Sequence, residues 1–195
     1  MKLHYKGKFD GNEESLPHGE HHDGAVQFRE PEAKKFTLIA NGGALILAAV
    51  LLVPFIFRAS PCFSAQSMIH FYGACLLFFV TLLPHELLHA LCFRGDVYLY
   101  TWFKRGALFV VGPEDMSKGR FIFMSLLPNL LFGVLPFVAF LIWSQLLVLG
   151  AFGVMAISAG FGDYINVFHA LTQMPKNART YLYGFHSYWF LPEGE

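Results

Sequence analysis

The stretch ACLLFFVTLLPHELLHALCF, residues 74–93, places titratable side chains at the end of an apolar segment. Between Ala59 and His85 the chain carries no Lys, Arg, Asp or Glu, and a run of this length can cross a membrane as a helix. Charged and titratable groups are costly within a bilayer, so a cluster of them inside an apolar helix indicates a functional site. The HELLH sequence at residues 85–89 is therefore the feature from which we interpret the rest of the chain.

HELLH matches the HExxH pattern of zinc metallopeptidases. Residues four apart share one face of a helix, so His85 and His89 can bind the same metal ion. Glu86 follows the first histidine, which is where the general base for a metal-activated water is expected. We therefore predict that the two histidines bind metal and that Glu86 is catalytic.

The composition is that of a chain surrounded largely by lipid. Of its 195 residues, 55% are hydrophobic and 14% are charged, whereas a soluble domain carries roughly 25% charged residues. The hydrophobic composition predicts membrane lipid as a partner. The formal net charge is zero, which gives no electrostatic basis for binding nucleic acid, and no nucleic acid is expected as a partner. Cys62, Cys75 and Cys92 show neither the spacing of a zinc site nor an even number for disulfides.

Charge-free runs predict four transmembrane helices, at about residues 36–57, 67–93, 121–143 and 147–172. The last two come from one uncharged run, residues 121–162. As a single helix this run would be about 63 Å long, twice the ~30 Å hydrocarbon thickness, so it must fold back on itself. The expected fold class is a mainly α, polytopic membrane protein with a small cytoplasmic β-hairpin.

Polar segments flank a predicted membrane domain at residues 36–176. Residues 1–35 form a polar N-terminal arm, and residues 177–195 form an aromatic tail. Lys and Arg concentrate in the arm, between residues 94 and 120, and in the tail. The positive-inside rule then places both termini in the cytoplasm of a multi-pass cell-membrane protein.

The hairpin is predicted at residues 96–112. Val97–Phe103 and Ala107–Val111 are rich in β-branched and aromatic residues and are separated by a basic, glycine-containing turn. One interpretation is a linker with some sheet. The other is an edge strand that holds an extended substrate by strand pairing, with Val97, Tyr98, Leu99 and Tyr100 as the pairing residues.

A catalytic zinc site usually needs a third protein ligand, and Asp163 is the other acid within the apolar region. At 1.5 Å per residue, His85 lies about 14 Å from the cytoplasmic end of its span, Asn129 about 14 Å and Asp163 roughly 15–20 Å. Three polar residues on three spans are thus expected at similar depth. This favours Asp163 as the third ligand.

Alternatives remain for the residues around the histidines. Asp163 could instead be a structural hydrogen-bonding acid, and His169 is a less favoured substitute ligand. Asn129 could contact substrate or an oxyanion, or could form an ordinary interhelical hydrogen bond. Asn166 lies three residues after Asp163 and could orient its carboxylate without binding the metal itself.

The motifs HELLHALCF at 85–93, LLPN at 126–129 and SAGFGDYINVF at 158–168 resemble those of site-2 protease-type intramembrane zinc metalloproteases. The chain more closely resembles a bacterial family of zincin-type membrane peptidases, catalogued as a domain of unknown function, over about residues 80–190. This resemblance implies one zinc ion held by His85, His89 and Asp163, with Glu86 as acid and base. The chain departs from site-2 proteases in lacking a glycine before Pro128 and in having Gly162-Asp163-Tyr164 where they have leucine-aspartate-glycine.

The sequence therefore predicts an intramembrane zinc metalloprotease that hydrolyses transmembrane or membrane-proximal protein or peptide substrates. The alternative is a non-proteolytic metal-binding membrane protein, such as a partner subunit, an immunity factor or a metal-handling protein. A third interpretation is a structural membrane protein in which the HExxH pattern is accidental.

Overall fold

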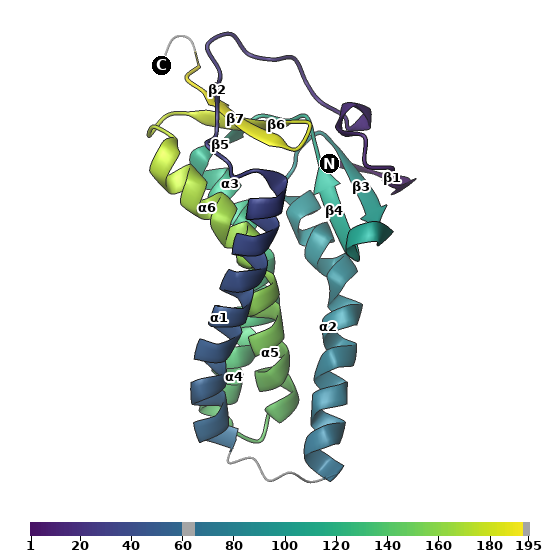
Figure 1. Ribbon diagram of the computed structural model, residues 1–195, viewed down its shortest axis with the longest axis vertical. Coiled ribbons are helices and arrows are strands. Elements are labelled where there is room, and N and C mark those ends of the chain that lie inside the picture. Colours follow the sequence, from purple (N-terminus) through teal and green to yellow (C-terminus); the bar gives the residue numbers. More distant parts are fainter. Residues whose placement is uncertain (60–64, 193–195) are drawn as a thin grey trace. The chain divides into compact units, whose positions relative to one another are not determined.

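The computed structural model describes residues 1–59 and 65–192, which are mainly helical with two small sheets (Figure 1). The described chain divides into two compact units. One contains residues 1–30, 86–125 and the described residues from 166 onward, and it holds the strands. The other contains residues 31–85 and 126–165 and is helical where described.

Three helical stretches are long and apolar enough to cross a membrane, and a bent pair brings the number of candidate spans to four. They are α1 (Ala33–Ala59), α2 (Ala65–Leu91) and a third that begins with α3 (Lys118–Pro128). The third stretch continues through a π-helix (Asn129–Val134) into α4 (Leu135–Ile142). The bent pair is α5 (Leu147–Ala159) and α6 (Phe161–Gln173), which meet at 48°.

These helices overlap all four predicted spans, with one difference. The predicted span at residues 147–172 is interrupted at Gly160, where α5 ends and α6 begins. The carbonyl of Gly160 accepts hydrogen bonds from the amides of Asp163 and Tyr164. The first turn of α6 is therefore built directly on the residue that ends α5.

Small residues bring the helices of the second unit close together. α1 packs against α5 (Figure 1). Phe137 and Phe140 of α4 and Val154 and Ile157 of α5 form a buried apolar core in this unit. Gly153 of α5 faces α4, where a Cβ would lie 2.7 Å from the Cβ of Phe137. Close approach through small residues is typical of packed helices in membrane proteins.

The predicted hairpin forms, but within a three-stranded sheet. β3 (Asp96–Trp102) and β4 (Ala107–Val111) are its antiparallel strands, and β1 (Lys2–Lys8) from the N-terminal arm pairs parallel with β3. The order β1-β3-β4 makes β3 the middle strand.

This order corrects the expectation that Val97–Tyr100 is a strand edge open to substrate. Leu3 pairs with Val97 and Tyr5 with Leu99, while β4 pairs on the other side of β3. Both edges of β3 are thus occupied by the chain itself. The outer edges of this sheet are β1 and β4.

The aromatic tail forms a second sheet. β6 (Arg179–Tyr183) and β7 (His186–Phe190) pair with each other, and the short strands β2 (Val26–Gln27) and β5 (Met116–Ser117) flank them in the order β2-β7-β6-β5. The N-terminal arm therefore contributes a strand to each sheet. This sheet is separate from the one that contains the hairpin.

Candidate metal centre

The HExxH residues lie near the C-terminal end of α2. One ligand atom from each of His85, Glu86 and His89 falls within 4.8 Å of the others. In the part of the chain that the structure describes, this is the one group of three such side chains that could hold a metal ion. His85 and Glu86 are partly exposed, whereas His89 is 8% exposed. A single continuous helix therefore supplies two imidazoles and a carboxylate together.

A backbone contact fixes the ring of His89. Its Nδ1 atom lies 2.9 Å from the carbonyl oxygen of Met124, in α3. A carbonyl can only accept, so Nδ1 carries the proton, and in the neutral ring Nε2 then keeps its lone pair. Metal-binding histidines commonly donate their second nitrogen to a carbonyl in this way, which sets the tautomer and the ring orientation.

Asp163 lies beside the first histidine. Its Oδ2 atom is 3.4 Å from Nε2 of His85, and both side chains are largely buried. Two ligands bound at ~2.0–2.1 Å to a tetrahedral zinc ion are about 3.3 Å apart. The spacing between these two atoms is therefore that of two neighbouring zinc ligands.

Asn129 is hydrogen-bonded to the same carboxylate. Its Nδ2 atom donates to Oδ2 of Asp163 at 2.7 Å. Of the two roles that the sequence left open for Asn129, the structure thus shows an interhelical hydrogen bond, and a substrate contact stays a prediction. The orienting contact expected of Asn166 is made here by Asn129. Asn166 is half-buried one turn further along α6, and its own role stays a prediction.

His169, the less favoured substitute ligand, is buried at 8% exposure. Its ring stacks edge-on against Phe28, with 6.3 Å between centroids. Phe28 belongs to the apolar core that includes Ala90, Phe93 and Ala170. The surroundings shown for this histidine are those of a packed core residue.

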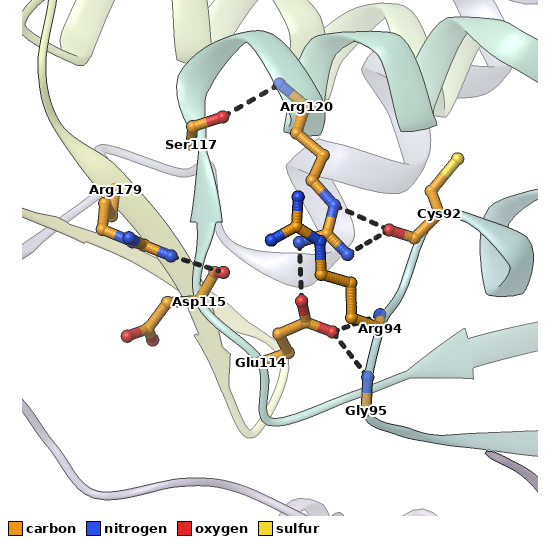
Figure 2. A network of polar contacts seen from close by, with 8 residues as sticks. All are labelled: Cys92, Arg94, Gly95, Glu114, Asp115, Ser117, Arg120 and Arg179. Atoms are coloured by element: carbon orange, nitrogen blue, oxygen red, sulfur yellow. Dashed lines mark hydrogen bonds and ion pairs between the residues drawn. The ribbon is translucent and has the colours of Figure 1, made fainter. Parts of the chain in front are cut away.

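A polar network that sequence reasoning missed holds the end of the HExxH helix (Figure 2). Arg120 donates to the carbonyl of Cys92 from both Nε and Nη2, the first at 2.8 Å, and its Nη1 lies 2.6 Å from Oε1 of Glu114. The other oxygen of Glu114 accepts the amides of Arg94 and Gly95 at 2.6 and 3.0 Å. One ion pair thus binds the carbonyl and amide groups left open where α2 ends.

The charge state of Glu114 follows from these contacts. Burial raises the pKa of Glu114, but the hydrogen bonds from Arg120, Gly95 and Arg94 and the positive charge of Arg120 hold it below its usual value. The carboxylate is therefore ionised across the neutral range. Little in the sequence indicated the Arg120–Glu114 pair, because Arg120 resembles any basic residue that precedes a predicted span.

The residue types of the His85, Glu86 and His89 group suit a zinc ion; Asp163 lies outside this group and is shown beside His85 alone. Catalytic zinc is bound by three protein ligands from His, Asp, Glu or Cys and keeps an open position for water. His85 and His89 supply two imidazoles, and Asp163 lies beside the first of them. Glu86 is left beside the histidines for proton transfer.

A helix that carries HExxH with these surroundings is the signature of the zincin class of metallopeptidases. Comparison with family models agrees with this class. The model described as "Putative zincin peptidase" matches residues 78–179, just over half of the chain, and the protein belongs to this family. The match includes the HExxH motif, Asn129 and Asp163. No curated protein and no solved structure matches the chain.

Proposed function

We propose that this member of the zincin peptidase family is an intramembrane zinc metalloprotease. Family membership supports a metallopeptidase. The observation that carries the finer proposal is the position of the His85, Glu86 and His89 group on α2, a helix long and apolar enough to cross a membrane. Substrates would be peptide bonds in membrane-embedded or membrane-proximal segments.

The exposed surface of the helices supports a lipid environment. Large apolar side chains on α1 and α2 are exposed at the protein surface, among them Leu45 at 73%, Phe57 at 83% and Phe79 at 67% exposure. Apolar patches of this extent on a protein mark contact with a membrane or another apolar partner. With the distribution of Lys and Arg, they favour a multi-pass protein with both termini in the cytoplasm.

The roles of the side chains follow from their chemistry. His85, His89 and Asp163 would hold the metal, and zinc when bound supplies Lewis acidity and a water of lowered pKa. The Glu86 carboxylate takes a proton from the attacking water and passes it to the leaving amine. The Met124 carbonyl keeps the His89 ring in one tautomer during this cycle.

An outer strand of the first sheet is the proposed holding place for an extended substrate. Because β1 covers β3, the role expected of Val97–Tyr100 moves to β4 (Ala107–Val111). Among residues 1–59 and 65–192, no strand pairs with the outer edge of β4. Backbone groups on such an edge can bind an unwound peptide, whose carbonyls are then exposed to attack.

The direct test compares cells carrying the wild-type chain with cells carrying Glu86→Gln. Proteomics of membrane fractions should show fragments that end inside or beside membrane segments only with the wild type. Glu86→Gln keeps the shape of the side chain and both histidines, so the purified variant should retain its metal. Identical fragment patterns from both chains, with metal retained, would favour the non-proteolytic metal-binding protein instead.

A further inference from the structure

We propose that Asn129 is a positioning residue that aims the Asp163 carboxylate at His85, and that Gly160 is glycine in order to admit the Asn129 side chain. The proposal rests on the proposed function, since it takes Asp163 as a metal ligand. It goes further by assigning two residues that act through Asp163 and bind no metal themselves. All four residues belong to the same compact unit.

The contact between Asn129 and Asp163 is short and partly buried. Asn129 is 2% exposed, and its Nδ2 atom donates to Oδ2 of Asp163 at 2.7 Å. That same oxygen faces Nε2 of His85 at 3.4 Å. The hydrogen bond therefore restrains the oxygen atom that is nearest to the histidine. Partners of this kind behind a metal ligand typically change metal affinity by about 10–100-fold when removed.

The backbone at Asn129 is irregular. Asn129 opens the π-helix Asn129–Val134 directly after Pro128, and the amide of Leu135 bonds to the carbonyl of Leu130, five residues earlier. A π-helical turn inserts an extra residue into an α-helix, which rotates the side chains that precede it relative to those that follow. Single π turns inside α-helices are frequent at functional sites. Here the irregular turn begins at the residue that contacts Asp163.

Gly160 provides the space. A Cβ at this position would overlap Oδ1, Cγ and Nδ2 of Asn129, and these are its three nearest atoms. The backbone of Gly160 has φ −72° and ψ 9°, which other residues adopt readily. The backbone conformation at residue 160 therefore does not require glycine. The close approach of the Asn129 amide does require it, because a larger side chain would overlap that amide.

Gly162 is a matched control within the same turn. It lies next to Asp163 in the sequence, and a Cβ there would meet nothing within 4 Å. Gly160→Ala and Gly162→Ala thus make the same chemical change two residues apart. Only the first change obstructs the Asn129 side chain.

The test measures zinc affinity of the full chain in detergent by competition with a chelator of known affinity. Asn129→Ala and Gly160→Ala should each weaken binding about 10–100-fold, and Gly162→Ala should leave it unchanged. The double variant Asn129→Ala/Gly160→Ala should bind as Asn129→Ala alone, because the obstructed side chain is then absent. Residues that act through one contact show such non-additivity.

Thermal unfolding of the metal-free chains separates positioning from general packing. If Asn129 only stabilises the packing of helices, Asn129→Ala should lower the unfolding temperature and leave the zinc affinity of the folded chain unchanged. That result would overturn the proposal. Additive losses in the double variant, or wild-type affinity in Gly160→Ala, also overturn it. Should Gly160→Ala fail to fold, the double variant must fold, since it lacks the overlap.

Cleavage is not measured in this experiment, so its outcome is distinct from that of the proposed function. A chain that binds zinc through these residues but cuts no substrate would retain the positioning role and lose the protease assignment. A wild-type chain that binds no zinc would overturn both.

Discussion

His85 and Asp163 approach to 3.4 Å between Nε2 and Oδ2, although α2 and α6 are distant in the sequence. In the absence of metal this is an ion-pair distance if the imidazole is protonated. If Asp163 is a zinc ligand, as proposed, the same distance suits two neighbouring ligands of one ion. The two side chains would then lie close together both with and without metal.

Asp163→Asn should weaken zinc binding by about 100-fold or more, because a neutral amide oxygen replaces a charged ligand. Removing a residue that only hydrogen-bonds to a metal ligand already weakens binding by up to about 100-fold. Chelator competition with the purified chain measures the effect. Asp23→Asn is the control, since it makes the same change at an exposed carboxylate in the N-terminal arm. Equal affinities for the two variants would remove Asp163 from the ligand set.

Glu114→Gln should destabilise the metal-free chain at neutral pH by about 1.5–3 kcal/mol, the usual contribution of hydrogen bonds to a charged group. The pKa of Glu114 is lowered in the folded chain, so its contribution is complete above the unfolded value of about 4.5 and is lost as pH falls through the lower folded value. The difference in unfolding temperature between wild type and variant should accordingly shrink at acid pH.

The control for that experiment is Glu32→Gln. Glu32 forms a 3.8 Å pair with Lys35, and both side chains are largely exposed. Such surface pairs contribute about 0–1 kcal/mol. A Glu114 effect no larger than this, or one that grows as pH falls, would contradict the assigned role of the Arg120–Glu114 pair at the end of α2.

Gly153→Ala should destabilise the helical unit. The added Cβ would lie 2.7 Å from Cβ and 2.8 Å from the backbone nitrogen of Phe137, neither of which can move without shifting α4. Overpacking of this kind costs about 1–3 kcal/mol. Thermal unfolding in detergent measures the loss.

Gly42→Ala makes the same substitution in α1, where a Cβ would meet nothing within 4 Å. Alanine is the better helix former by about 1 kcal/mol, so this variant should be as stable as the wild type or more so. The close packing of α4 on α5 would be refuted by a Gly153→Ala chain that unfolds at the temperature of Gly42→Ala.

Much of the helical framework could be predicted from the sequence. Charge-free runs located the long helices, and HExxH stood out because titratable side chains are rare in such apolar stretches. The similar depth expected for Asp163 and Asn129 rested only on the rise of a helix per residue. The two side chains are hydrogen-bonded to each other in the structure.

Other features depend on contacts between distant segments. The parallel pairing of β1 with β3 brings Leu3 to Val97, and nothing local in the polar arm specifies that partner. The hydrogen bond between Asn129 and Asp163 joins the start of the π-helical turn to α6, two elements far apart in the sequence. Helical periodicity assumes regular α-helix, so it misplaces side chains where the backbone departs from it.

The metal centre on α2 is tested most simply by metal analysis of the purified wild-type chain beside His85→Ala and Glu86→Gln. We expect close to one equivalent of zinc in the wild type and in Glu86→Gln, and loss of that zinc in His85→Ala. Zinc that persists after His85→Ala, or a correctly folded wild-type chain that takes up none when zinc is supplied, would contradict a metal centre on α2.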